Sequence, residues 1–377
     1  MRYNVLLTWS QCGSRYEPPG HAENSLLRPC KGARVVTEAT ADQMRAILLE
    51  TYQDDSSAAI RGLKVAKRPI PKPRRGQVLV KIEAAPCNPS DLLLLQGKYG
   101  QLKDLPTVPG WEGAGTVVAS GGGLLAGWLK GKRVACALQG NRDGTWAEYF
   151  AADAMMCIPL KRDLPIEQAA ALTINPLTVM GLLDVARRSG HRAAVHTAAA
   201  SQLGRMLLTV AEEMEYPLIH VVRRDAQVQL MRSLGAEHVL NSSDAEFAEQ
   251  LAAACRQLGA TAAFEAVAGS MTGTVLHAMP PGSTAYVYGV LSEEPCSNIH
   301  PIELIFHGKT VTGFFLGDWV KSRGALRVFR AANRLQRMML DRRIETKVQA
   351  RVSLDDAVEG LQRYAGNMTD GKVLIMP

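Results

Sequence analysis

The stretch RAAVHTAAASQLGRMLLTVAEE, residues 192–213, decides the fold expected for this chain. A β-prone run, AAVHTA, enters a loop of small residues, and apolar residues at helical spacing follow it, among them Leu203, Met206 and Leu207. Dinucleotide-binding βαβ units have this order, and they carry glycines in the loop so that a pyrophosphate can approach the backbone. Only Gly204 is present here. The loop by itself predicts a strand-to-helix turn and leaves open whether a nucleotide binds to it.

Strand and helix patterns alternate on both sides of this stretch, between about residue 166 and residue 308. The β-prone runs LIHVV, EHVLN, TAAFEAV and STAYVYGV are separated by segments with helical periodicity, such as AQVQLMRSL and AEFAEQLAAACRQL. Strands separated by helices predict right-handed crossovers and a parallel sheet that is covered on both faces. We therefore predict a doubly wound, Rossmann-type nucleotide-binding domain over residues 166–308.

The rest of the chain has a different pattern. Residues 44–165 consist of short β-prone runs punctuated by Pro and Gly, which predicts a β-rich domain. The mixed pattern after KTVTGFFL predicts that residues 309–377 complete that domain. Residues 1–43 lack sustained periodicity, so we expect a poorly ordered N-terminal extension, with a transit peptide as the alternative. The expected fold class is α/β with two domains, because 377 residues exceed what one ordinary core supports.

Composition and charge argue against several classes of protein. No apolar run approaches the ~20 residues of a membrane span, and the apolar fraction of 47% is that of a globular protein. The net charge of +7 rests on single or paired basic residues, which suits a small anionic ligand better than a nucleic acid. The seven cysteines form no CxxC pair, which indicates reduced thiols and a cytoplasmic protein, or a mitochondrial matrix protein if the extension is a transit peptide.

The end of the strand LIHVV bears on the choice of nucleotide. An acidic residue at this place accepts a hydrogen bond from the ribose of NAD, whereas arginine pairs with the 2′-phosphate of NADP. Arg223 and Arg224 stand here and favour NADP. Asp225 would suit NAD, but it falls where the next helix needs an N-cap. In the preceding loop Ser201 could donate to a phosphate or cap the helix, whereas Gln202 is bulkier than the expected glycine.

No metal site is expected from the sequence. A catalytic zinc needs several converging Cys, His or carboxylate ligands, and a structural zinc usually needs four closely spaced cysteines. Neither pattern occurs, and HExxH, GxSxG and Walker-type motifs are absent from the sequence as well.

Several runs, taken in order, resemble the medium-chain dehydrogenase/reductase superfamily: IEAAPCNPSDLLLLQGKYGQLKDLPTVPGWEGAGTVVASG, GKRVACAL, GTWAEYFAADA, LTINPLTVMGLL and SLGAEHVLNSS. Within it, the chain is similar over residues 44–377 to the zinc-free 2-enoyl thioester reductases, which are related to the quinone oxidoreductases. The resemblance implies a GroES-like catalytic domain beside the Rossmann domain. Zinc-dependent members have a histidine ligand where Trp111 stands, which agrees with a metal-free protein and leaves Cys87 structural.

The resemblance also implies a set of site residues. The tyrosine of the run QGKYG, Tyr99, would be the proton donor. The small-residue loop departs from the AGGVG form that is common in quinone oxidoreductases. The implied contacts to NADPH are Asn175, Ala200, Ser201, Gln202, Leu203, Arg223, Arg224, Asp225, Tyr288, Gly289, Val290, Leu291, Phe314, Phe315, Leu316, Gly317 and Lys372.

The chemistry explains why a tyrosine suits this position. Hydride addition to the β-carbon of an α,β-unsaturated thioester places negative charge on the thioester oxygen, and the α-carbon then needs a proton. A hydroxyl group beside that path can stabilise the enolate or supply the proton. Tyrosine, with an ordinary pKa of ~10, is protonated at neutral pH and can donate.

Three functions therefore remain open at this point. The first is NADPH-dependent reduction of the C=C bond of an enoyl-CoA or enoyl-acyl carrier, with a small-molecule substrate and no nucleic-acid or membrane partner. The second is NADPH:quinone oxidoreduction on the same fold. The third is a catalytically silent NADPH-binding or structural protein, since the superfamily includes lens crystallins. Its members are commonly dimers, so a homodimer is expected.

Overall fold

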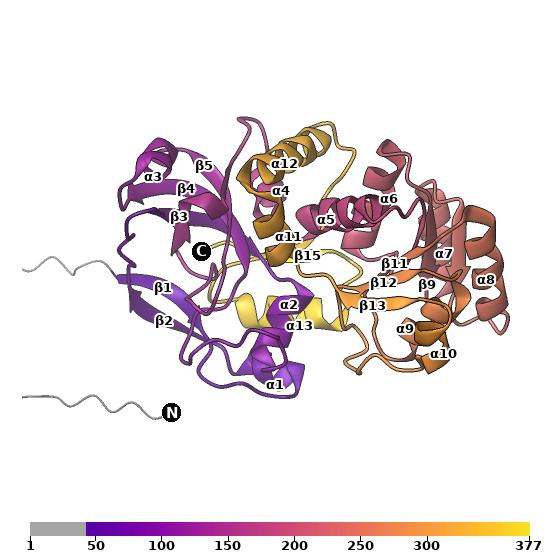
Figure 1. Cartoon of the computed structure of the whole chain (residues 1–377). Helices are drawn as coiled ribbons and strands as arrows, with labels where there is room; N and C mark the ends of the chain where they lie inside the picture. Colours follow the sequence, from indigo (N-terminus) through magenta and orange to yellow (C-terminus); the bar gives the residue numbers. More distant parts are fainter. Residues whose placement is uncertain (1–42) are drawn as a thin grey trace, which may run out of the picture. The chain divides into compact units, whose positions relative to one another are not determined.

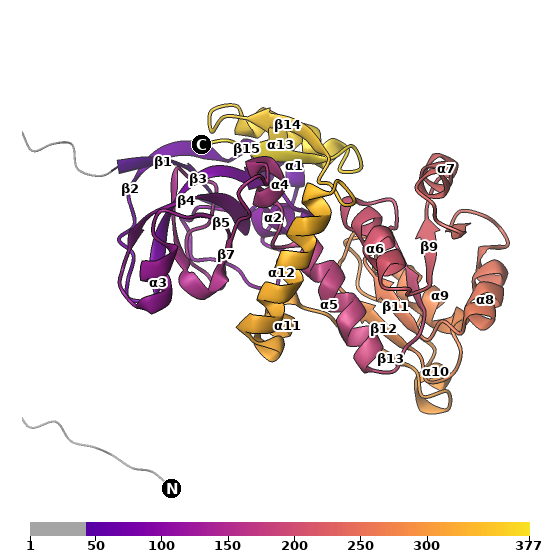
Figure 2. The ribbon, with the colours of Figure 1, turned by 90° about the horizontal axis from the view of Figure 1, so that it is seen from above.

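The computed structural model describes residues 43–377 (Figure 1). The extension predicted for residues 1–43 lies outside the described residues, apart from Gln43, which opens the first strand. Two domains lie side by side in both views of the ribbon, and α5, α11 and α12 lie where they meet (Figures 1 and 2). No helix within residues 43–377 is long and apolar enough to cross a membrane.

The catalytic domain is built on a sheet in the order β14-β15-β3-β4-β5-β7, in which β6 also pairs with β3. Val78, Val80 and Ile82 alternate along β3 and are buried in the core of this domain. Its strands are β1 (Gln43–Leu48), β2 (Lys64–Pro69), β3 (Gln77–Pro86), β4 (Glu112–Ser120), β5 (Arg133–Ala137), β6 (Tyr149–Asp153), β7 (Cys157–Pro159), β14 (Val348–Val352) and β15 (Lys372–Ile375). Its helices are α1 (Ser56–Arg61), α2 (Pro89–Leu95), α3 (Leu124–Leu129), α4 (Ile166–Ala170) and α13 (Ala357–Gly366), with a 3-10 turn at Ala154–Met156.

The nucleotide-binding domain is a six-stranded sheet in the order β10-β9-β8-β11-β12-β13, with every pair parallel. Its strands are β8 (Ala194–His196), β9 (Leu218–Val222), β10 (His238–Asn241), β11 (Ala262–Glu265), β12 (Thr284–Val287) and β13 (Thr310–Gly313). Its helices are α5 (Asn175–Arg188), α6 (Gln202–Glu213), α7 (Asp225–Ser233), α8 (Phe247–Leu258), α9 (Ser270–Ala278), α10 (Pro301–Ile305), α11 (Leu316–Arg323) and α12 (Ala325–Leu340). Phe264 faces a core shared with α5 and α6, whereas its neighbour Ala263 faces the core under α8 and α9. The predicted fold class, a β-rich domain plus a doubly wound parallel sheet, is confirmed.

The predicted boundaries of the nucleotide-binding domain need correction at both ends. The chain does not leave this domain at residue 308, because β13 pairs with β12 and α12 packs against α5. It rejoins the catalytic domain only with β14, which pairs with β15, the strand that pairs with β3. At the other end α4 packs against β3 and β4, so the nucleotide-binding domain begins with α5 rather than at residue 166. A short run such as KTVTG has strand composition, but nothing in it indicates which of two sheets it joins.

Candidate active site

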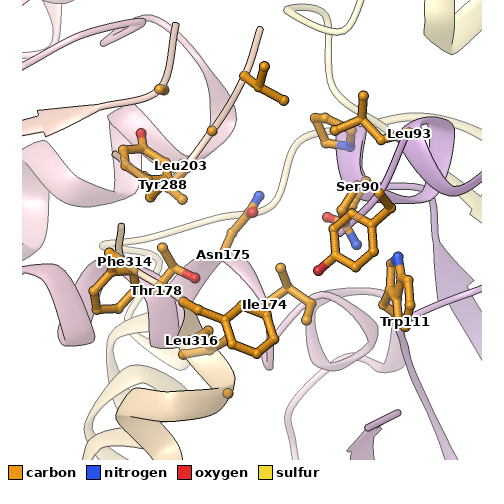
Figure 3. A pocket seen from close by; sticks show the side chains of 18 of the residues that line it. Ser90, Leu93, Trp111, Ile174, Asn175, Thr178, Leu203, Tyr288, Phe314 and Leu316 are labelled. Atoms are coloured by element: carbon orange, nitrogen blue, oxygen red, sulfur yellow. The ribbon is translucent and has the colours of Figure 1, made fainter. Parts of the chain in front are cut away.

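One large cavity, of about 2300 Å³, opens between the two domains. The catalytic domain contributes Tyr99 to its wall. Figure 3 shows Trp111 of the same domain across the cavity from Asn175, Tyr288 and Phe314 of the nucleotide-binding domain. The nucleotide-binding side of the cavity lies at the carboxyl ends of the parallel strands, where open α/β sheets bind their ligands. All the predicted site residues line this cavity except Arg224 and Asp225.

The loop between β8 and α6 is shaped for close approach despite having one glycine. Ser201 is the N-cap of α6, and its Oγ accepts a hydrogen bond from the Gly204 N–H at 3.1 Å. A Cβ atom at Gly204 would lie 2.1 Å from the Ala199 carbonyl oxygen, so this glycine lets the helix pack on the strand. Ala198 has φ 52°, a left-handed conformation that favours glycine. The loop has therefore kept the glycine needed for packing, and an alanine takes the strained position.

The side chain of Gln202 is engaged within the protein. Its Nε2 donates to the Glu345 carbonyl oxygen at 2.6 Å, and its Oε1 accepts from the Lys347 N–H at 3.2 Å and from Arg205 at 3.2 Å. These contacts tie the start of α6 to the segment that leads into β14. As the first residue of α6, Gln202 offers a bound phosphate its backbone N–H rather than its side chain.

The three residues that follow β9 have different environments. Arg223 is exposed and lines the cavity, with its backbone N–H bonded to Gln227. Arg224 is the N-cap of α7, so the prediction that Asp225 takes that position is wrong by one residue. The Asp225 carboxylate accepts from Asn241 Nδ2 at 2.8 Å and lies outside the cavity. This arrangement leaves an arginine, and no carboxylate from these three residues, on the cavity wall.

Tyr99 lies in the loop after α2, between Gly97 and Gly100. Its ring packs against Trp111 with the ring centroids 4.8 Å apart and the planes at 40°. Burial, and to a lesser extent the nearby Asp91 carboxylate, raise the pKa of Tyr99 above its ordinary value. The hydroxyl group therefore keeps its proton at neutral pH.

A buried polar network lies beneath this end of the cavity. Lys372 Nζ donates to Asn88 Oδ1 at 2.6 Å, and Asn88 Nδ2 donates to Glu112 Oε1 at 3.0 Å. The other oxygen of Glu112 accepts from the hydroxyl of Thr173 at 2.7 Å and from the backbone N–H of Ile174 at 2.8 Å. Burial raises the pKa of Glu112 and lowers that of Lys372. The network joins the last strand of the catalytic domain to the residues just before α5.

Asp91 and Lys103 hold Trp111 in place. Asp91 is fully buried, and its carboxylate accepts from the backbone N–H of Trp111 at 3.2 Å and from that of Asn88 at 2.8 Å. Burial raises the pKa of Asp91 to about 7. The Lys103 ammonium lies 4.8 Å from the centroid of the Trp111 ring. The indole N–H itself has no hydrogen-bond partner within residues 43–377.

Family models match both domains. The model for the alcohol dehydrogenase GroES-like domain matches residues 74–162, and the model for zinc-binding dehydrogenase matches residues 203–331. The chain is 31% identical to the mitochondrial enoyl-[acyl-carrier-protein] reductase of Rattus norvegicus over 330 residues, which cover 84% of this chain and 85% of that protein. The chain belongs to the medium-chain dehydrogenase/reductase superfamily.

Further relatives of the superfamily agree with this result. The human mitochondrial enoyl-[acyl-carrier-protein] reductase is 32% identical over 255 residues, 66% of this chain and 67% of that protein. A crystal structure described as an NADPH:quinone reductase from Mesorhizobium loti has a TM-score of 0.82 and 34% identity, and covers 90% of this chain and all of that one. A mycobacterial protein in complex with NADPH has a TM-score of 0.74 and 26% identity, over 89% of this chain and all of that one.

The superfamily contains zinc-dependent and zinc-free branches, and this chain belongs to the zinc-free branch. No group of three or more His, Cys, Asp or Glu side chains in the described part of the chain could hold a metal ion. Cys87 is fully buried, and burial raises the pKa of its thiol well above the ordinary value. Trp111 stands beside it as a packed aromatic residue rather than a ligand.

The sequence analysis missed the buried charged residues around Trp111. Asp91, Lys103 and Glu112 are buried charged residues whose partners lie far from them in the sequence or are backbone groups. The only available signal was the presence of charged residues inside apolar runs, such as Asp91 in NPSDLLLL.

Proposed function

We propose that this member of the superfamily reduces the C=C bond of a 2-enoyl thioester, an enoyl-CoA or enoyl-acyl carrier, with NADPH as the hydride source and Tyr99 as the proton donor. The observation that carries the proposal is the position of Tyr99. A tyrosine whose raised pKa keeps it protonated lines the same cavity as the cofactor loop. The enoyl-[acyl-carrier-protein] reductases among the relatives support the same reaction.

The nucleotide-binding side of the cavity fits NADPH. The first turn of α6 has free backbone N–H groups for the pyrophosphate, and the side chain of Gln202 is bonded to Glu345 instead of occupying this place. Arg223 supplies an exposed cation for the 2′-phosphate. Asn175, Tyr288 and Phe314 line the part of the cavity between this loop and Tyr99. NADPH supplies the hydride when it is bound.

The chain's own residues then line the reaction site and supply the proton. Apolar side chains on the cavity wall, such as those of Leu93, Ile174 and Leu316, lower the polarity around the substrate (Figure 3). Tyr99 transfers its phenolic proton to the α-carbon, and the tyrosine is reprotonated from solvent through the open cavity. Because an ester-type α-carbanion is far more basic than a phenolate, the raised pKa of Tyr99 does not prevent this transfer.

A turnover screen tests the proposal. Purified protein is given NADPH with crotonyl-CoA, with longer 2-enoyl-CoAs and with several quinones, and NADPH oxidation is followed by absorbance. We expect enoyl-CoA reduction that saturates with substrate. Failure to reduce any enoyl thioester while quinones are reduced would reject the proposal in favour of the alternative below.

The alternative is NADPH:quinone oxidoreduction, favoured by the 34% identity to the Mesorhizobium loti protein. A quinone can accept a hydride with less dependence on a placed acid, so this activity would survive removal of the Tyr99 hydroxyl. A catalytically silent protein is the remaining alternative. Fluorescence titration with NADPH tests it, and saturation in the micromolar range without turnover of either substrate class would favour it.

We also propose that two copies pair through β13, the edge strand of the parallel sheet. Thr310 and Phe314 donate their N–H groups to β12, so the N–H groups of Val311 and Gly313 point away from the sheet. Ile305 and Phe306 beside this edge are 69% and 75% exposed. Light scattering should show a dimer that Val311→Pro converts to a monomer, and an unchanged mass would contradict the pairing.

For the location we propose the cytoplasm, with the mitochondrial matrix as the alternative if residues 1–42 act as a transit peptide. The buried, unpaired thiols of Cys87, Cys136 and Cys255 are compatible with either compartment, because both keep thiols reduced. Imaging of fluorescent fusions with and without residues 1–42 distinguishes the two.

A further inference from the structure

The indole N–H of Trp111 is a buried donor without an acceptor. Trp111 is 5% exposed, lines the cavity, and its Nε1 makes no hydrogen bond within the described residues. A buried donor left unpaired costs roughly 1–3 kcal/mol. Such a group in a folded protein needs an explanation, and a site completed by a ligand is one.

The ring is held in one position. Its backbone N–H donates to Asp91, the Lys103 ammonium lies over the ring at 4.8 Å, and Tyr99 packs against it with centroids 4.8 Å apart. Figure 3 shows the indole at the edge of the cavity, with its nitrogen on the side that faces Ser90. The donor is thus fixed in direction before any ligand arrives, which is the arrangement that lowers the cost of binding.

The polar groups beside Trp111 are already used. Asn88 donates to Glu112 and accepts from Lys372, and both oxygens of Glu112 accept hydrogen bonds. Asp91 accepts from two backbone N–H groups. None of these acceptors is paired with the indole, so its N–H is available to an acceptor on a molecule in the cavity.

Tyr99 partly shields this donor in the present structure. The tyrosine is flanked by Gly97, at φ 70°, and by Gly100, and contact between a ligand and the covered indole N–H requires this loop to move. The burial of Trp111 then favours a strong hydrogen bond, because the low-polarity surroundings strengthen the interaction between donor and acceptor.

We propose that Trp111 Nε1–H donates a hydrogen bond to the carbonyl oxygen of the thioester substrate, as a second catalytic residue beside Tyr99. The inference rests on the proposed function. It assigns stabilisation of the enolate oxygen to Trp111 and proton donation to Tyr99. A hydride from NADPH forms the Cβ–H bond, and the π electrons of the C=C bond move toward the thioester oxygen, where the indole N–H stabilises them. Tyr99 then gives its proton to the α-carbon, which forms the Cα–H bond and restores the carbonyl.

The test replaces Trp111 by Phe, which keeps an aromatic ring against Lys103 and Tyr99 but removes the N–H. With crotonyl-CoA, Trp111→Phe should lower kcat/KM about 100-fold, as the loss of an oxyanion donor does, and leave the KM for NADPH unchanged. Trp128→Phe is the matched control, since Trp128 is 55% exposed on α3 and does not line the cavity. It should keep the wild-type rate.

A binding measurement separates a hydrogen bond from a packing role. Butyryl-CoA has the carbonyl oxygen, and its thioether analogue S-butyl-CoA lacks it. Trp111→Phe should weaken butyryl-CoA binding about 5- to 10-fold and leave S-butyl-CoA binding unchanged. Equal weakening of both ligands, or a wild-type rate in Trp111→Phe, overturns the inference. If the wild-type protein reduces no enoyl thioester, the proposed function fails, and the same pair of titrations still decides whether Trp111 binds the carbonyl oxygen.

Discussion

The two ends of the cavity are built differently. The end formed by the β8–α6 loop and Arg223, the cofactor end, consists of backbone groups and exposed side chains. The end formed by Tyr99 and Trp111, the acid end, is supported by buried charged residues. At the cofactor end the loop offers the N–H groups of α6, and Arg223 reaches the cavity from an exposed position. At the acid end Lys372, Glu112 and Asp91 are almost fully buried. Asn88 accepts a hydrogen bond from Lys372 and donates one to Glu112, and Asp91 accepts from the backbone N–H of Trp111. The phosphates of a charged cofactor can pair with cations and N–H groups at an open surface. The pKa of an acid, in contrast, is shifted by surroundings from which water is excluded.

Removal of the Tyr99 hydroxyl should have the largest effect. It should lower turnover, which depends on the acid end, and leave NADPH binding at the cofactor end intact. Tyr99→Phe is expected to lower enoyl-CoA turnover about 10²- to 10⁴-fold, since general acid catalysis contributes that much. NADPH binding, measured by fluorescence, should stay within about twofold because the cofactor loop is not altered. Unchanged enoyl-CoA turnover would show that Tyr99 is not the acid.

The buried network should be far more sensitive to substitution than a surface ion pair. Lys372→Met leaves Asn88 Oδ1 and the buried carboxylates without their cation, and we expect a loss of about 3–5 kcal/mol in the free energy of unfolding. Urea denaturation measures it. Lys64→Met, which breaks the exposed pair with Glu50, is the matched control and should cost no more than about 0.5 kcal/mol. Similar losses in the two variants would mean that the network does not carry the stability assigned to it.

The ribose end should distinguish two adjacent arginines. Arg223→Ala is expected to weaken NADPH binding about 10- to 100-fold by removing a charge-assisted contact to the 2′-phosphate, and to leave NADH binding unchanged. Arg224→Ala should have less than about a threefold effect, because Arg224 does not line the cavity. Fluorescence titration with both nucleotides measures the four affinities. Equal losses for NADPH and NADH would remove the argument for the 2′-phosphate.

The smallest effect is expected in the loop itself. Ala198→Gly should raise the free energy of unfolding by about 1 kcal/mol, because glycine adopts a positive φ without the strain that alanine has. Gly204→Ala, in the first turn of α6, should destabilise the protein, since its Cβ would lie 2.1 Å from the Ala199 carbonyl oxygen. Thermal unfolding compares the two variants. A loss of stability in Ala198→Gly would show that the alanine has a packing role that outweighs its strain.

The two ends also differ in how far they could be predicted. The cofactor end is local in sequence: one strand, one loop and one helix, residues 192–213, fix its geometry through hydrogen bonds of short range. The end of β9 follows from the same periodicity, although Asp225 lies one position after the N-cap. The acid end joins residues near 88, 112, 173 and 372. The resemblance implied roles there for Tyr99, through the run QGKYG, and for Lys372 as a contact to NADPH, but the network that joins these residues was not predicted.

The sequence by itself determined the two-domain α/β class and the strand–loop–helix unit, because periodicity and short motifs depend on neighbours along the chain. Only the tertiary structure decided that β13 extends the nucleotide-binding sheet, that Gln202 binds the segment before β14, and that the indole N–H of Trp111 has no acceptor among residues 43–377. These features depend on which distant segments pack together. Hydrogen bonds between residues more than a hundred positions apart, such as Lys372 to Asn88, have no local pattern from which they could be predicted.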